Sequence, residues 1–184
     1  MNFNILRYDT ITSTNIAALE QARRGAKEGL CVVAREQTKG RGRQGREWVS
    51  ERDSGLYFSV VLRPEIETNF LPLLTLMTSI IVYEVLVDLY ELKPDIKWSN
   101  DVLVGEKKIS GILAETAETD NKLAVIVGIG INLNSNSFPS ELSNTATSIN
   151  QETGESPDAE RLLNSITSFF SFFYDIFLGE HGAA

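Results

Sequence analysis

Residues 30–63, LCVVAREQTKGRGRQGREWVSERDSGLYFSVVLR, place two apolar runs on either side of a loop rich in glycine and arginine. The runs at 30–35 and 56–63 contain the β-branched and aromatic residues that favour strands. Residues 40–45, GRGRQG, match the dinucleotide-binding pattern G-x-G-x-x-G, but that pattern must open a helix whose N-terminus receives a pyrophosphate. Here the chain continues as loop and strand. The stretch therefore predicts two strands joined by a glycine-arginine loop over 39–48, the Gly-Arg loop.

The rest of the chain predicts further strands and three helices. Strands are expected at 5–11, 95–98, 101–104, 108–115 and 122–133, with tight turns at 105–106 and 120–121. Helices are expected from the cap-type residues 12–15 to about 24, from Asn69 to about 90, and from Ser156-Pro157 through FFSFFYDIFL. Residues 143–156 are polar and predict a loop. Since hairpins join most strands and no alternating βαβ pattern is seen, we expect an α+β fold with a central mixed, mainly antiparallel sheet flanked by helices.

Composition and charge restrict the kind of ligand. The 184 residues are 42% hydrophobic and 23% charged, so we expect a single domain over 1–184. A net charge of −8 disfavours nonspecific binding to nucleic acid or to an anionic membrane. Against this background a cluster of cations is opposed only by Glu36: Arg35, Lys39, Arg41, Arg43 and Arg46. The cluster indicates a site for a small anion, and a solvated basic loop is the alternative on charge alone.

The positions of cysteine, histidine and the apolar runs disfavour metal sites, histidine-based triads, signal sequences and membrane spans. The one cysteine, Cys31, lies in the run LCVVA and is expected to be a buried thiol. The one histidine, His181, lies near the C-terminus, so we expect neither a metal site nor a histidine-based triad. Residues 1–10 lack the apolar stretch of a signal sequence, and polar residues interrupt 70–89, which predicts a buried helix. We expect a cytoplasmic protein with no membrane partner.

Two further clusters combine glycine with charged or amide residues. Residues 97–101, KWSND, precede a predicted hairpin that carries Lys107 and Lys108. Strand alternation puts these lysines on opposite faces, so only one can point into a site; alternatively both are solvated edge lysines. Residues 128–132, GIGIN, place two glycines inside an apolar strand, which weakens it unless a ligand or another backbone approaches closely.

Taken in order, these blocks resemble the catalytic domain of biotin protein ligases. The matching blocks are TSTN at 12–15, GRGRQGR at 40–46 with Trp48, KWSND at 97–101, KISGIL at 108–113, GIGIN at 128–132 and ATS at 146–148. The resemblance covers about residues 5–178. Two positions depart from the family pattern: Ser99 stands where proline is usual, and Ser110 stands where glycine or alanine is usual.

The resemblance implies a fold related to class II aminoacyl-tRNA synthetases and a two-step reaction. Biotin and ATP give biotinyl-5′-AMP, and a lysine of the biotin carboxyl carrier protein of acetyl-CoA carboxylase then receives the biotin. Mg²⁺ is expected with ATP. By resemblance Lys108 and Arg43 are catalytic. The residues implied in biotin binding are Ser13, Thr14, Asn15, Gln37, Gly40, Arg41, Gly42, Arg43, Lys108, Gly111 and Gly128. Those implied in ATP binding are Arg43, Arg46, Trp48, Asn100, Lys108 and Asn132.

The remaining expectations concern neighbouring residues, other functions and partners. Asp101 is expected to orient Lys108 or the amine nucleophile, and Trp98 to pack in the core. Lipoate or octanoate ligases share the fold, but their arginine-glycine-histidine signature is absent; a biotin- or nucleotide-binding module without turnover is a further alternative. RNA binding is disfavoured because no aromatics interleave with the arginines. The winged-helix and small β-barrel domains of some members are expected to be absent, so DNA binding is not expected, and a homodimer stays open.

Overall fold

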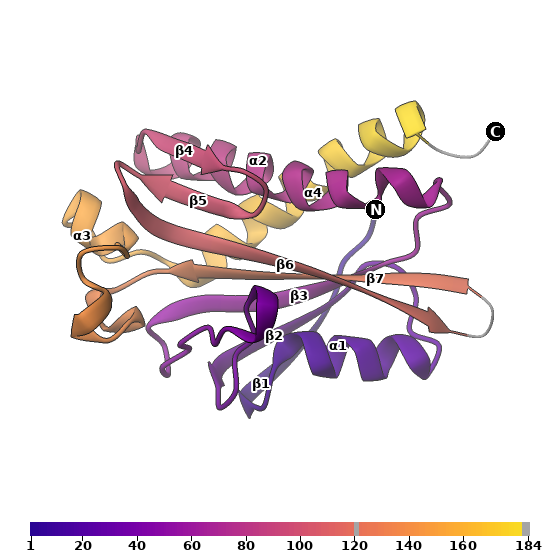
Figure 1. Ribbon diagram of the computed structural model, residues 1–184, viewed down its shortest axis with the longest axis horizontal. Helices are drawn as coiled ribbons and strands as arrows, with labels where there is room; N and C mark the ends of the chain where they lie inside the picture. The colour runs from indigo at the N-terminus through magenta and orange to yellow at the C-terminus, as the bar shows by residue number, and fades with distance from the viewer. Residues whose placement is uncertain (120–121, 182–184) are drawn as a thin grey trace.

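The computed structural model describes residues 1–119 and 122–181, and within these ranges the strands form one mixed sheet (Figure 1). The strands are β1 (Asn4–Ile11), β2 (Leu30–Gln37), β3 (Gly55–Leu62), β4 (Pro94–Lys97), β5 (Asp101–Val104), β6 (Lys107–Thr119) and β7 (Lys122–Asn132). The α-helices are α1 (Thr14–Arg23), α2 (Leu71–Tyr90), α3 (Ile149–Thr153) and α4 (Ala159–His181). Short 3₁₀ turns occur at Arg43–Gly45, Thr68–Phe70, Ser135–Ser137 and Ser140–Leu142.

The strand order is β1-β2-β3-β7-β6-β5-β4. Every described pair is antiparallel except β1 with β2. The expected α+β fold, with a mixed and mainly antiparallel sheet flanked by helices, is therefore confirmed. The parallel pair was not foreseen: β1, α1 and β2 form one βαβ unit, because helix α1 carries the chain back so that β2 runs beside β1 in the same direction.

Strand alternation gives the two faces of the sheet different roles. On β7, Val125, Val127 and Ile129 point into a large apolar core beneath α2 and α4. Their neighbours Ala124 and Ile126 point to the other face, into a smaller core beneath α1. Figure 1 shows α2 and α4 on one side of the sheet and α1 on the other. On the α1 side, β7 continues into Gly128 and Gly130, so along the strand this face changes from apolar core to glycines covered by Asn15 and Trp48.

Helices α2 and α4 are long and apolar enough, by length and composition alone, to cross a membrane. In this structure they pack on each other and on the sheet, with side chains such as Leu74, Ile81 and Phe170 fully buried. Core helices meet the same criterion of length and composition. The expectation of a buried helix over the run at 70–89 is therefore confirmed.

Helix boundaries differ from the sequence-based expectations where a local cap decides them. Helix α4 begins after Asp158, whose Oδ1 accepts the backbone N–H groups of Glu160 and Arg161 at 2.9 and 3.1 Å, and not after Ser156. A carboxylate is a stronger N-cap acceptor beside the positive end of the helix. Helix α2 is preceded by the 3₁₀ turn at 68–70, with no side-chain cap from Asn69.

One short helix lies in a segment that was expected to be a loop. Helix α3 (Ile149–Thr153) is capped by Ser148, whose hydroxyl accepts the N–H of Gln151, and it ends at Gly154 with φ +76°. Serine followed three residues later by glutamine is a capping signature, so the sequence contained the signal. The turn expected at 120–121 lies outside the described residues, whereas the turn at 105–106 between β5 and β6 is confirmed.

Candidate active site

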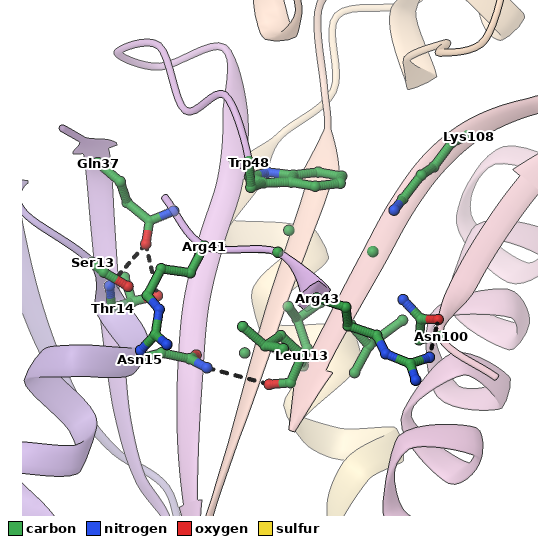
Figure 2. A pocket seen from close by; sticks show the side chains of 16 residues that line it. Ser13, Thr14, Asn15, Gln37, Arg41, Arg43, Trp48, Asn100, Lys108 and Leu113 are labelled. Carbon is green, nitrogen blue, oxygen red and sulfur yellow. Dashed lines mark hydrogen bonds between the residues drawn. The ribbon is translucent and has the colours of Figure 1, made fainter. Parts of the chain in front are cut away.

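A pocket lies on the α1 face of the sheet, where the Gly-Arg loop crosses over β6 and β7 (Figure 2). The cavity that these groups enclose has a volume of about 50 Å³. The residues that line it come from the start of α1, the end of β2, the Gly-Arg loop, the turn before β5, and strands β6 and β7: Ser13, Thr14, Asn15, Gln37, Arg41, Gly42, Arg43, Trp48, Asn100, Lys108, Gly111, Ile112, Leu113, Gly128, Ile129 and Gly130. Segments far apart in sequence therefore meet here, and most residues implied by the resemblance lie among them.

Glycines form the floor of the pocket and let other groups lie against the sheet. A Cβ atom at Gly130 would lie 2.5 Å from the indole of Trp48, and one at Gly111 would lie 2.8 Å from the same ring. A Cβ atom at Gly128 would lie 2.0 Å from Oδ1 of Asn15. Such separations are far below van der Waals contact, so only glycine fits at these positions. The glycines inside the apolar strand β7 thus allow the side chains of Asn15 and Trp48 to lie close against the strand.

One end of the pocket is lined by amide and hydroxyl groups. Oε1 of Gln37 accepts the backbone N–H and the hydroxyl of Thr14, at 2.8 and 3.1 Å. The hydroxyl of Ser59 donates to Oδ1 of Asn15 at 2.6 Å and lies 2.7 Å from Oγ1 of Thr14. These bonds fix the start of α1 against β2 and β3. The arrangement presents amide and hydroxyl groups with set orientations to any ligand that reaches this end.

Ser59 was missed from the sequence, although a signal was present. It is the single polar residue inside the apolar strand LYFSVVL and is fully buried. A buried polar side chain needs a hydrogen-bond partner, so its position predicts a polar cluster on that face.

The other end of the pocket is cationic. Nζ of Lys108 lies 2.7 Å from Oδ1 of Asp101 and 5.1 Å from the centroid of the Trp48 ring. Asn100 donates from Nδ2 to the same Asp101 oxygen at 2.8 Å. Lys107 is exposed, with no ion pair among the described residues. The expected separation of the two lysines is confirmed, and Asp101 orients Lys108 as expected.

Arg43 reaches across the rim of this cationic end. Its Nη1 donates to Oγ of Ser99 at 3.0 Å and to Oδ1 of Asn100 at 2.8 Å. The serine that replaces the usual family proline therefore supplies a hydrogen-bond acceptor. Both residues lie between β4 and β5, so Arg43 ties the Gly-Arg loop to that side of the pocket.

A second cavity of about 350 Å³ shares Trp48 and Lys108 with the first. It also contains Arg46 and Asn132, two residues implied in ATP binding. Nδ2 of Asn132 donates to the carbonyl of Thr147 at 2.9 Å, which holds the end of β7 against the segment before α3. The two cavities thus meet at Lys108.

Gly40, Trp98 and Arg35 lie elsewhere than the sequence predicts. Gly40 does not line the first pocket, because its carbonyl accepts the N–H of Trp48 and its Cα packs against that backbone. Trp98 is 72% exposed, so the expectation that it packs in the core was wrong. It lies in the turn between β4 and β5, beyond the reach of the sheet's apolar faces.

Arg35 was counted with the cations of the anion site, and the structure places it elsewhere. Its guanidinium binds both carboxylate oxygens of Asp53, at 2.7 and 2.6 Å, and Asp9 at 3.0 Å. Hydrogen bonds from Arg35 hold the pKa of Asp53 below its usual range, and those from Arg52 do the same for the pKa of Asp9. Arg35 and Asp53 flank the Gly-Arg loop, so these pairs fasten its two ends.

The pocket thus has amide and hydroxyl groups at one end and cations at the other, and the second cavity opens at the cationic end. The family model for the biotin/lipoate A/B protein ligase family matches residues 8–132. The chain therefore belongs to the biotin/lipoate A/B protein ligase family.

Individual relatives agree with this membership. The chain is 41% identical to the bifunctional ligase/repressor BirA of Bacillus subtilis, over 92% of this chain and 53% of that protein, and so spans about half its length. It is 35% identical to the biotin–[acetyl-CoA-carboxylase] ligase of Paracoccus denitrificans, over 86% of this chain and 68% of that protein. The structure of biotin protein ligase from Aquifex aeolicus, in complex with biotin and ATP, superposes with a TM-score of 0.81 at 37% identity, over 95% of this chain and 71% of that one. The fold is the class II synthetase-like fold that the resemblance implied.

Proposed function

We propose that this chain activates biotin with ATP as biotinyl-5′-AMP and transfers the biotin to a lysine of a biotin carboxyl carrier protein. The observation that carries the proposal is the placement of Lys108, on the cationic end of a pocket whose other end is lined by amide and hydroxyl groups. Biotin matches this division, with an uncharged ureido ring at one end and a carboxylate at the other. The Aquifex aeolicus relative, solved with biotin and ATP, supports the same assignment.

The pocket suggests how biotin lies. Thr14 and Gln37 face the ureido group, with Ser13 beside them. The Trp48 ring and Leu113 lie on opposite sides of the pocket, where they can enclose the apolar ring system and chain (Figure 2). The carboxylate then points toward Lys108 and Arg43. Neutral donors and acceptors suit the ureido group because they bind it without leaving a charge buried and unpaired.

In the first step a carboxylate oxygen of biotin attacks the α-phosphorus of ATP, and pyrophosphate leaves. Lys108 and Arg43 offset the repulsion between the two anions and stabilise the charge that develops at phosphorus. Lys108 suits this role because Asp101 and Asn100 fix its position before the ligands arrive. ATP would occupy the second cavity, beside Arg46, Trp48 and Asn132.

In the second step the lysine amine of the carrier attacks the carbonyl carbon of the mixed anhydride. The new amide bond forms, the bond to the phosphate oxygen breaks, and AMP leaves with that oxygen. Mg²⁺ is expected to accompany ATP on its phosphates. Among residues 1–119 and 122–181, no group of three His, Cys, Asp or Glu side chains is arranged to hold a metal ion.

Biotin-dependent exchange of labelled pyrophosphate into ATP tests the first step directly. We expect exchange with biotin and none with lipoate or octanoate, because a ureido ring can form hydrogen bonds with the amide and hydroxyl groups of the pocket, whereas the aliphatic tail of the other acids forms none. Transfer to a purified carrier domain tests the second step. Exchange supported by lipoate or octanoate alone would reassign the substrate. A thermal shift with biotin but no exchange would indicate a binding module.

A further inference from the structure

The Gly-Arg loop is fastened across the pocket by an ion pair with β6. Nη2 of Arg41 lies 2.9 Å from Oε1 of Glu115, and the two side chains are 45% and 28% exposed. Figure 2 shows the Arg41 side chain extending from the loop into the pocket, with its guanidinium beside Asn15. The loop is thus joined to the sheet at a point well inside its span.

Glu115 has a second partner, which sets the orientation of its carboxylate. Its Oε2 accepts from Nδ2 of Asn15 at 2.8 Å. The same Nδ2 donates to the carbonyl of Leu113 at 3.3 Å, while Oδ1 of Asn15 accepts from Ser59. Both N–H donors of the Asn15 amide are therefore used by protein groups. One carboxylate joins three elements, namely α1, the Gly-Arg loop and β6.

The position of Glu115 follows from the pleat of β6. Gly111, Leu113 and Glu115 alternate onto one face, and the first two line the pocket. Glu115 continues this row just beyond the pocket wall, where an arginine from the overlying loop can reach it.

We propose that Glu115 is a positioning residue that latches the Gly-Arg loop over the pocket through Arg41. The latch and the Arg43 contacts with Ser99 and Asn100 hold the loop on opposite sides of the pocket. Both attachments join protein groups only, so they stabilise the closed loop with or without a ligand. When Glu115 loses its charge, the loop keeps only the Arg43 attachment, and the fraction of molecules with an open Gly-Arg loop increases.

Limited digestion with trypsin, which cuts the chain on the C-terminal side of the arginines in the Gly-Arg loop, tests the latch in the free protein. We compare the wild type, Glu115→Gln and Glu118→Gln, since Glu118 lies on the same strand with an exposed side chain. We expect Glu115→Gln to be cut about twofold to fivefold faster, the population shift that a partly exposed ion pair supports, and Glu118→Gln to match the wild type. At high salt the wild type should approach Glu115→Gln because salt screens the pair. Equal rates for all three proteins would overturn the proposal.

The consequence for the ligand rests on the proposed function and is measured separately. We expect Glu115→Gln to release biotin about twofold to fivefold faster in stopped-flow fluorescence, with Trp48 as the reporter, and to raise the KM for biotin by a larger factor than it lowers kcat for pyrophosphate exchange. Slower release or tighter binding would overturn the latch, because Arg41 would then obstruct the pocket. Failure of the wild type to bind biotin would refute the proposed function and leave the digestion result to decide the latch.

Discussion

Replacing Lys108 by alanine tests the part of the structure on which the proposed chemistry depends most. The Lys108 ammonium lies 2.7 Å from Asp101, and Asn100 supports the same carboxylate, so the cation is held in place before substrates bind. Loss of one such preorganised group costs about a hundredfold to a thousandfold in kcat, or roughly 2.7–4 kcal/mol of transition-state stabilisation. We therefore expect Lys108→Ala to slow biotin-dependent pyrophosphate exchange by at least about a hundredfold.

Lys107→Ala is the matched control for this experiment. The two lysines are adjacent on β6 and equally charged, but Lys107 is exposed on the opposite face of the strand. Its replacement should change exchange by less than about twofold, as expected for a solvated surface charge. The loss in Lys108→Ala should lie mainly in kcat, because the charge acts on the developing phosphoryl transition state more than on bound biotin. Equal losses in the two variants would refute the assignment of Lys108 to the site.

Four further outcomes are expected. Gly128→Ala would place a methyl group 2.0 Å from Oδ1 of Asn15, and the overpacking should destabilise the protein by about 1–3 kcal/mol in urea titrations. Gly179→Ala is the control: nothing lies within 4 Å of its added methyl group, so it should cause no such loss of stability. Trypsin should cut the Gly-Arg loop of the free protein when it opens transiently and cut more slowly with biotin and ATP, because bound anions offset the repulsion among the loop's arginines and the entropy that its glycines favour in the open state. Rates unaffected by saturating ligands would exclude such gating. Arg43→Gly removes the loop's contacts at the cationic rim, so escaping adenylate should biotinylate lysines of a bystander protein, detected by streptavidin blot; bystander labelling equal to the wild type would contradict this. Burial raises the pKa of the Cys31 thiol to about 12, so at pH 8 it should react with a disulfide reagent only after unfolding, and rapid native labelling would show that the thiol is accessible.

The sequence alone determined the features that depend on neighbours along the chain. Apolar runs bounded by glycine and proline located the strands, and the polar segment between β2 and β3 identified a loop where a nucleotide-binding helix would otherwise begin. Strand alternation by itself placed Lys107 and Lys108 on opposite faces of the hairpin. Glycines inside the apolar β7 predicted a close approach, since nothing else explains their cost in a buried strand.

Tertiary structure decided which of these residues meet, because contacts between distant segments leave no periodic signal in one sequence. Arg35 and Arg41 look alike in the cationic cluster, yet the first binds Asp53 beside the loop and the second binds Glu115 across the pocket. Trp98 carries an apolar ring that predicts burial, but the turn that holds it faces solvent. A residue type sets what a side chain can bind, whereas the packing of α1, the Gly-Arg loop and β6 on one sheet face sets which partner it finds.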